Sequence, residues 1–310
     1  GEPVVRITGV GSLPHTDAHE ASTFVVETTD LPYLPQLPNI DASEGMLRQW
    51  ADGLCGDGGT DDGIGLRYGE PSAPPDSAFG GAEAMLDAFH GPELKTQFAG
   101  PVTLFLALLA AGCPYDGLWD CVVRGLADRV QAHVDMISRA KPGVAVIAVM
   151  DEPALVTFAP GRSGGPVPIE AAADAMARVM AAAPVPVGVH VCGDTDWRTV
   201  AGLRPAWFSW DLAGLGDGFL NATDAIAETI SSGTGIMWGM VPTDPSPIDI
   251  DRIRSRYGTA VTRLVIDGAP AQALTSGSLA TPACGLAGVS VGGAGVVMDR
   301  LREVVELVDA

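Results

Sequence analysis

The sequence predicts a (β/α)8 TIM barrel formed by a single domain over residues 1–310. About eight short runs of β-branched or apolar residues alternate with longer segments of helical spacing, an order typical of a parallel sheet surrounded by helices. A length of 310 residues suits an undivided α/β barrel. The turn at residues 9–14 lacks the G-x-G-x-x-G pattern that usually follows the first strand of an open doubly wound sheet.

Each predicted element has a local signal. The predicted strands are 4–10, 31–37, 94–99, 144–150, 185–191, 206–211, 236–241 and 278–284. Predicted helices include 84–89, 103–111, 118–139, 169–183, 220–230 and 296–308. Helix-start residues stand before two helical segments, at Asp17 and at Asp196. Gly and Pro in residues 55–80 predict an insertion after the second strand, and those in residues 158–167 predict a second irregular segment. Both are expected either to cover the top of the barrel as lids or to be mobile loops.

The chain carries a formal net charge of −20 and has no acidic tail. Such a surface repels phosphate groups, which argues against nucleic-acid and membrane partners. No run approaches the roughly 20 apolar residues of a membrane span, and no basic-then-apolar leader is present. Five cysteines lie far apart, and this odd number predicts reduced thiols rather than a disulfide framework. We therefore expect a cytoplasmic protein.

Polar side chains close six of the predicted strands. Active sites of parallel barrels lie at the carboxyl ends of the strands, so these side chains are expected at one rim although they are remote in sequence. The residues are Ser12, Asp151, His190 with Cys192, Asp211, Thr243 with Asp244, and Cys284.

His190 and Cys192 lie one residue apart at the end of an alternating strand, so both side chains point to the same face. Imidazole and thiolate together favour zinc over Mg2+ or Ca2+. Cys284 closes the last strand as a third candidate ligand, and three ligands with one open position are typical of a catalytic zinc. The alternative is a core histidine with inert buried cysteines. Asp211 is either a fourth, labile ligand or a helix cap.

Asp151 follows a purely apolar strand. A carboxylate there either forms a salt bridge or receives a substrate ammonium group, and its place at a strand end favours the substrate role. His15 follows the first strand and is a candidate substrate or proton contact. Cys55, Cys113 and Cys121 are expected to be structural.

Five short motifs stand at or near the predicted strand ends: Val10-Gly11-Ser12-Leu13-Pro14, Gly100-Pro101-Val102-Thr103, Asp151-Glu152-Pro153-Ala154-Leu155, His190-Val191-Cys192 and Pro282-Ala283-Cys284-Gly285-Leu286. In this order and spacing they resemble the catalytic half of cobalamin-independent methionine synthase. The resemblance covers essentially the whole chain, and the five motifs are specific together although each alone is weak. The wider superfamily includes uroporphyrinogen decarboxylase and zinc methyltransferases that act on coenzyme M.

The resemblance implies zinc on His190, Cys192 and Cys284, with Asp211 in the place of the family's glutamate ligand. Zinc lowers the pKa of a bound thiol, so that a nucleophilic thiolate exists at neutral pH.

The resemblance also implies a homocysteine site. Asp151 matches the aspartate that holds the ammonium group of the substrate, and Val10, Gly11 and Ser12 match the turn that holds its carboxylate. Asp244 stands where the family has its catalytic histidine.

The chain departs from the family at several positions. The amino-terminal half of the long enzymes is absent, so the chain is similar to the short, barrel-only members. Ala107 stands near the position of the folate-stacking tryptophan, and Thr157 near that of a further glutamate. Gln36 stands near the second ammonium-binding glutamate, for which Glu70 is a local look-alike. The resemblance therefore supports activation of a thiol more strongly than it supports binding of a folate.

The leading hypothesis is a zinc-dependent methyltransferase that methylates a thiol, L-homocysteine, to form methionine. Its partners would be a small-molecule thiol and a methyl donor, either folate or a methyl-carrying protein. The alternatives are alkyl transfer to another thiol such as coenzyme M, a metal-free decarboxylase of the uroporphyrinogen type, and a zinc-dependent thiol-binding protein without turnover. The methyl donor and the oligomeric state are left open.

Overall fold

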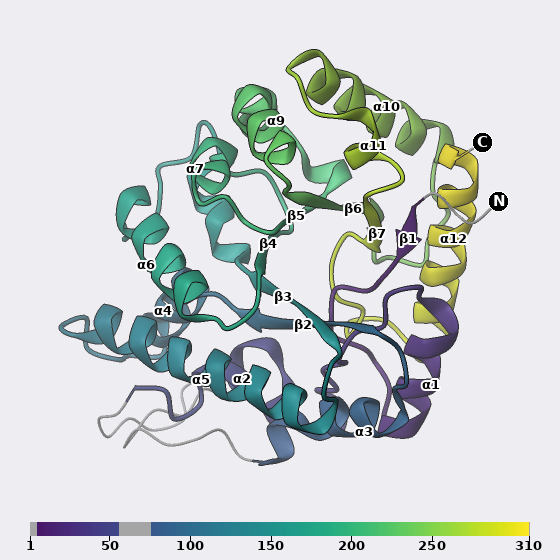
Figure 1. Cartoon of the computed structure of the whole chain (residues 1–310). Coiled ribbons are helices and arrows are strands. Elements are labelled where there is room, and N and C mark those ends of the chain that lie inside the picture. Colours follow the sequence, from purple (N-terminus) through teal and green to yellow (C-terminus); the bar gives the residue numbers. More distant parts are fainter. Residues whose placement is uncertain (1–4, 56–75, 310) are drawn as a thin grey trace.

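The structure, a computed structural model, describes residues 5–55 and 76–309. Its centre is a curled sheet of seven strands with helices packed outside it (Figure 1). All pairs of neighbouring strands are parallel. The strands are β1 (Arg6–Ile7), β2 (Glu93–Ala99), β3 (Ala145–Asp151), β4 (Val187–Val191), β5 (Trp207–Asp211), β6 (Gly235–Val241) and β7 (Leu279–Pro282), in the spatial order β1-β7-β6-β5-β4-β3-β2.

Helices lie between successive strands, as the alternating pattern predicts. All six of the predicted helices overlap helices of the structure, whereas α10, one of the longer ones, was not among them. The extent of the single domain, 1–310, stays a prediction. The helices are α1 (Ala18–Thr28), α2 (Met46–Ala51), α3 (Gly80–Ala88), α4 (Pro101–Ala110), α5 (Leu118–Ala140), α6 (Ile169–Ala182), α7 (Trp197–Gly202), α8 (Asp217–Leu220), α9 (Thr223–Ser231), α10 (Ile250–Ile266), α11 (Ala271–Leu274) and α12 (Val291–Asp309), with 3-10 turns η1 (Ala42–Glu44), η2 (Asp76–Phe79), η3 (Pro153–Phe158) and η4 (Leu212–Gly214).

The second predicted strand, residues 31–37, is not a strand in the structure. It makes only isolated bridges, from Tyr33 to Lys95 of β2 and from Gln36 to Ser12. Prolines at 32, 35 and 38 explain the difference, because a proline has no N–H to donate to a ladder. The described elements therefore form a curled seven-stranded sheet rather than a complete eight-stranded ring.

The predicted loops are only partly described. Residues 56–75, most of the predicted 55–80 insertion, lie outside the described residues, as does Glu70. The described part resumes at η2 and continues into α3. The second predicted segment, 158–167, is irregular as expected: it follows η3 and precedes α6.

Aromatic side chains fill the layer between the sheet and the helices. Trp210 of β5 and Trp238 of β6 are paired in register, both are fully buried, and their ring centroids are 5.4 Å apart. Trp197 of α7 packs edge-on against Trp210 at 5.4 Å. Burial of such large apolar groups on both faces is typical of parallel sheets, and it holds the outer helices against the strands.

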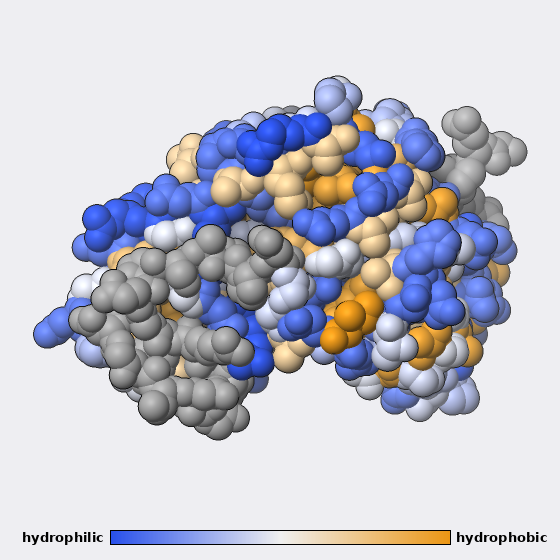
Figure 2. Space-filling view, turned by 90° about the horizontal axis from the view of Figure 1, so that it is seen from below, coloured by the Kyte–Doolittle hydropathy of each residue, from blue (hydrophilic) through white to orange (hydrophobic). Residues whose placement is uncertain are grey.

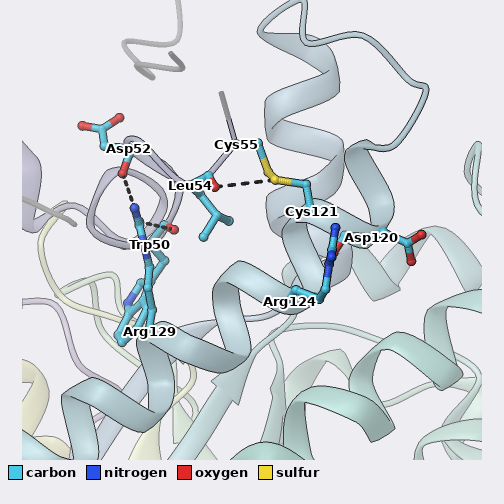
Figure 3. The surroundings of a disulfide bond; sticks show 8 residues. All are labelled: Trp50, Asp52, Leu54, Cys55, Asp120, Cys121, Arg124 and Arg129. Atoms are coloured by element: carbon cyan, nitrogen blue, oxygen red, sulfur yellow. Dashed lines mark hydrogen bonds between the residues drawn. A yellow bond between two sulfur atoms is a disulfide. The ribbon is translucent and has the colours of Figure 1, made fainter. Parts of the chain in front are cut away.

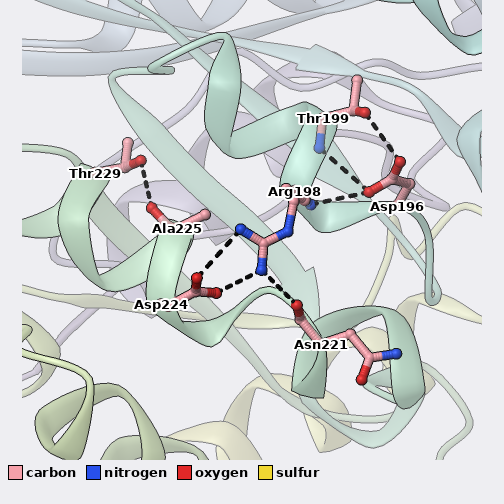
Figure 4. A network of polar contacts seen from close by, with 7 residues as sticks. All are labelled: Asp196, Arg198, Thr199, Asn221, Asp224, Ala225 and Thr229. Atoms are coloured by element: carbon pink, nitrogen blue, oxygen red, sulfur yellow. Dashed lines mark hydrogen bonds and ion pairs between the residues drawn. The ribbon is translucent and has the colours of Figure 1, made fainter.

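Aspartate caps confirm the two predicted helix starts. Asp17 accepts hydrogen bonds from first-turn amides of α1, and Asp196 does so for α7. Figure 4 shows how Arg198 of α7 pairs with both oxygens of Asp224 of α9, at 2.6 and 3.2 Å. It also donates to the carbonyl of Asn221 at the end of α8, at 2.7 Å. These groups are exposed, so the pair orients the helices more than it stabilises them.

Cys55 and Cys121 form a disulfide, which corrects the prediction of reduced thiols at these positions (Figure 3). Their separation of 66 residues hides the proximity in the sequence, whereas in the fold their Cα atoms are 5.9 Å apart. Arg129 ties the same segment to α5, because it donates to the carbonyls of Trp50 at 2.8 Å and Asp52 at 2.7 Å. Disulfides are uncommon in reducing compartments, so a cytoplasmic location stays a prediction.

Hydrophobic residues at the surface are scattered. On the face shown in Figure 2 they are interspersed with hydrophilic residues. Exposed apolar side chains such as Tyr115, in the loop before α5, and Ile266, at the end of α10, belong to different segments, which is ordinary for a folded chain. Among the described helices, none combines the length and the apolar character that crossing a bilayer requires.

Glu152 joins β3 to the start of α4. Its side chain is fully buried, and its oxygens accept hydrogen bonds from the amides of Val102 at 2.8 Å and Thr103 at 2.9 Å and from the Thr103 hydroxyl at 2.6 Å. A Cβ at Gly100 would collide with this carboxyl group. Burial raises the pKa of Glu152 to about 7, and the hydrogen bonds oppose the shift. The contacts fix the position of the neighbouring Asp151.

Glu152→Gln is expected to lower the free energy of unfolding by about 2 kcal/mol, because the amide NH2 would face a backbone donor and leave buried groups unsatisfied. Urea denaturation measures the difference. Glu170→Gln is the matched control, since Glu170 stands exposed in the first turn of α6 and should change stability little. Equal losses in the two variants would contradict the role of Glu152.

Candidate active site

One row of paired residues crosses the sheet near its carboxyl edge. Asp151 of β3 pairs with His190 of β4, which pairs with Ser209 of β5. Partners in a parallel register project from the same face of the sheet, so the three polar side chains point the same way. The row continues through Met237, which belongs to a small buried cluster of Leu31, Val149, Met237 and Leu279. The predicted convergence of Asp151 and His190 is therefore present, above an apolar layer.

His190 is 4% exposed and has a fixed ring orientation. Its Nδ1 lies 2.8 Å from the hydroxyl oxygen of Ser209. Its Nε2 is buried and has no partner at hydrogen-bond geometry within the described residues, although the Cys284 thiol lies near enough for His190 to lower its pKa. A buried imidazole nitrogen without a partner is costly unless a ligand or metal ion uses it.

Cys192 and Cys284 are free cysteines whose thiols interact. The hydrogen bond from Cys284 lowers the pKa of Cys192 to about 7. The pKa of Cys284 is raised to about 12 by Cys192, while His190 acts in the opposite direction. The two thiols thus come from the ends of β4 and β7 to one place beside His190, and Cys192 is the more acidic of the two.

Asp211 closes β5 and does what the cap alternative predicted: it accepts a hydrogen bond from the amide of Ala213 at 2.8 Å at the start of η4. It also interacts electrostatically with His190 and Cys192. Burial raises its pKa above the ordinary value, although hydrogen bonds from the backbone oppose the shift. The cap does not exclude a ligand role, because a carboxylate has several acceptor positions.

The four candidate metal ligands are neighbours, but they do not form a closed ligand set. No group of three or more His, Cys, Asp or Glu residues in the described part of the chain is spaced to hold a metal ion. The donor chemistry nevertheless fits zinc, because one open imidazole nitrogen stands beside two thiols, one of them easily deprotonated.

Asp151 is 5% exposed, and its Oδ1 has no hydrogen-bond partner among the described residues. Burial raises its pKa to about 7, while the charge of Lys95 opposes the shift. Lys95 is itself buried, and burial lowers its pKa to about 8 while Asp151 raises it. A buried carboxylate with one open oxygen is suited to receive a cationic ligand group.

The turn Val10, Gly11 and Ser12 is held from two sides. Lys95 Nζ donates to the Val10 carbonyl at 2.6 Å, and the Leu286 amide donates to the Ser12 carbonyl at 2.8 Å. Any side chain at position 11 would collide with the Gln97 amide group, so the close packing of the turn requires glycine there. The Cys284 loop and this turn are therefore in direct contact.

The remaining candidates lie apart from this cluster. Asp244 is exposed after β6 and accepts hydrogen bonds from the amide and hydroxyl of Ser246, which lower its pKa. His15 is buried against Phe24, its Nδ1 has no partner among the described residues, and burial lowers its pKa. Gln36 donates to Gln49 at 2.6 Å. Among the described residues, none of the three forms a hydrogen bond with either thiol, although the backbone amide of Gln36 donates to the Gly11 carbonyl of the turn at 3.1 Å.

Sequence reasoning missed two residues of the site, Ser209 and Lys95. For Lys95 a signal was available, because a lysine within the apolar strand 94–99 is almost never buried without partners. Ser209 had no signal of its own, because only the register of β4 and β5 places it beside His190.

Comparison with known proteins supports the fold. No protein-family model and no curated protein matches the chain. The structure of a B12-independent methionine synthase from Shewanella sp. W3-18-1, in complex with selenomethionine, superposes with a TM-score of 0.62 over 97% of both chains at 13% identity. A methyltransferase from Methanosarcina mazei superposes with a TM-score of 0.57 over 96% of this chain and 93% of the other, also at 13% identity. The chain shares the fold of these two enzymes.

In metal-free protein, alkylation of Cys192 by iodoacetamide should have a midpoint near pH 7, because the thiolate is the reactive form. Cys284→Ala removes the hydrogen bond that lowers this pKa, so the midpoint should move to higher pH. Mass spectrometry of the labelled peptide against pH measures the shift. Cys113→Ala, which alters a buried cysteine elsewhere, should leave the midpoint unchanged. An unmoved midpoint in Cys284→Ala would contradict the pairing of the thiols.

Proposed function

We propose that the chain is a zinc-dependent methyltransferase that acts on a thiol, resembling the B12-independent methionine synthase whose fold it shares. The observation that carries the proposal is the open Nε2 of His190 beside the thiols of Cys192 and Cys284. This donor set stands at the carboxyl ends of parallel strands, where enzymes of related folds carry their chemistry.

His190, Cys192 and Cys284 would hold the zinc ion, with Asp211 as the fourth group in the same place. When bound, zinc would lower the pKa of the substrate thiol and supply a nucleophilic sulfur at neutral pH. Ser209 keeps the imidazole oriented through Nδ1 and so leaves Nε2 for ligation. The low pKa of Cys192 reduces the cost of the deprotonation that ligation requires.

L-homocysteine is the proposed thiol and methionine the product. Asp151 would bind the ammonium group through its open Oδ1, and the turn Val10, Gly11 and Ser12 would bind the carboxylate. The apolar cluster below the row keeps water from beneath the reacting groups. The sulfur attacks the methyl carbon, and the bond from that carbon to the donor breaks with its electrons leaving on the donor.

The donor side of the site is less defined by the described residues. Asp244 is the proposed catalytic residue there, and its exposure leaves it accessible to a folate or to a methyl-carrying protein. The location we propose is cytoplasmic.

One observation favours a second candidate, alkyl transfer to a thiol with an anionic tail such as coenzyme M. Lys95 supplies a buried positive charge close to Asp151, and a sulfonate needs such a cation. An amino-acid thiol would use the charge of Lys95 for its carboxylate and Asp151 for its ammonium group. A sulfonate thiol without an ammonium group would leave Asp151 unpaired.

Zinc content tests the proposal first. Wild-type protein reconstituted under reducing conditions should hold about one zinc per chain, and Cys284→Ser and His190→Ala should hold far less. Cys113→Ser is the matched control and should retain the metal. Elemental analysis measures zinc, and methyl transfer to L-homocysteine from a panel of donors measures turnover. Wild-type protein without zinc after reconstitution would overturn the proposal.

Asp151→Asn should weaken binding of L-homocysteine at least about tenfold, because the buried amide cannot balance the ammonium charge. Binding of 4-mercaptobutyrate, which has no ammonium group, should be weakened far less. Isothermal titration calorimetry measures both affinities. Equal weakening for the two thiols would show that Asp151 supports the structure of the site and does not bind the ammonium.

A further inference from the structure

Lys95 is one of only two lysines in the chain, and it stands in the middle of β2 with 2% of its surface exposed. Removing an ammonium group from water is costly and is tolerated where partners compensate for the lost hydration. Here its Nζ donates to the Val10 carbonyl at 2.6 Å and to Gln97 Oε1 at 3.3 Å, and it lies 5.8 Å from the centre of the Tyr33 ring. Its strongest contact is thus with the turn after β1.

The turn has all three of its carbonyl groups engaged. The Val10 carbonyl accepts a hydrogen bond from Lys95 Nζ. The Gly11 carbonyl accepts one from the backbone N–H of Gln36 at 3.1 Å, and the Ser12 carbonyl accepts one from the backbone N–H of Leu286 at 2.8 Å. The amides of Gly11 and Ser12 make no hydrogen bond with any described part of the chain. Successive unengaged amides form an anion-binding concavity.

We propose that Lys95 is a positioning residue that makes the site selective for thiols bearing a carboxylate. It holds the Val10 carbonyl away from the ligand, so that the following amides face the anion, and its charge adds to their field. The inference rests on the proposed function only in taking the thiol as ligand. The Oδ1 of Asp151, which has no hydrogen-bond partner among the described residues, supplies negative charge at the same site. An amino acid can therefore bind with its carboxylate at the turn and its ammonium group at Asp151.

Lys95→Met tests the proposal, because methionine has similar length and no charge. Calorimetry with the zinc-loaded protein would use three ligands: L-homocysteine, 3-aminopropane-1-thiol, which lacks the carboxylate, and L-homoserine, which lacks the thiol. The variant should lose at least about tenfold in affinity for the two carboxylates and less than about twofold for the aminothiol. Lys141→Met, the change at the other lysine, is the control and should bind all three as wild type does.

An equal loss for all three ligands, or no loss, would overturn the role of Lys95. A third outcome is that wild-type protein binds homoserine as tightly as homocysteine and Lys95→Met loses affinity only for the two carboxylates. This result would support the role of Lys95 and contradict the proposed function on a thiol. Wild-type protein that binds none of the ligands would overturn both.

A measurement on the wild-type chain covers the case in which Lys95→Met does not fold. With two lysines, 15N-lysine labelling yields two side-chain signals, and Lys141→Met assigns them. The Lys95 signal should shift on addition of L-homocysteine or L-homoserine and stay in place with 3-aminopropane-1-thiol. A shift with the aminothiol as large as with homocysteine would contradict selection of the carboxylate.

Discussion

The candidate site depends on the parallel register of β3, β4 and β5. Asp151, His190 and Ser209 lie in one row of paired residues, so their side chains project from one face. A slip of one residue in any pairing would turn one of them toward the outer helices. The large aromatic side chains between sheet and helices oppose such a slip, because Trp210 and Trp238 would then have to enter the interior. Packing on the outer face thereby fixes the chemistry on the inner face.

Two charged side chains buried in or next to the sheet, Lys95 and Glu152, have hydrogen-bond partners. Lys95 is held by a carbonyl and an amide oxygen, and Glu152 by two amides and a hydroxyl. Two atoms near the row stay open among the described residues, Oδ1 of Asp151 and Nε2 of His190. Unpaired buried polar atoms are costly, and because these two lie beside the thiols of Cys192 and Cys284, a ligand bound there would supply the missing bonds.

The thiol side and the donor side of the site differ in how firmly they are built. The turn at Ser12, the Cys284 loop and β2 contact one another, so the groups around the proposed thiol are mutually constrained. Asp244 is exposed and bonded only to its own loop through Ser246. A firm thiol side with an accessible donor side would suit the proposed methyl transfer from a large or varied donor.

The sequence by itself determined the alternation of strands and helices, the strand ends that carry Asp151 and His190, and the caps at Asp17 and Asp196, because these depend on local periodicity and hydrogen bonding. The prediction of a strand at residues 31–37 was wrong, because the prolines in this apolar segment prevent regular pairing with a neighbouring strand. Only the tertiary structure decided the Cys55–Cys121 disulfide, the place of Ser209 beside His190 and the link from Lys95 to Val10. These are contacts between segments distant in the chain, and they arise from strand register and packing, which no local pattern specifies.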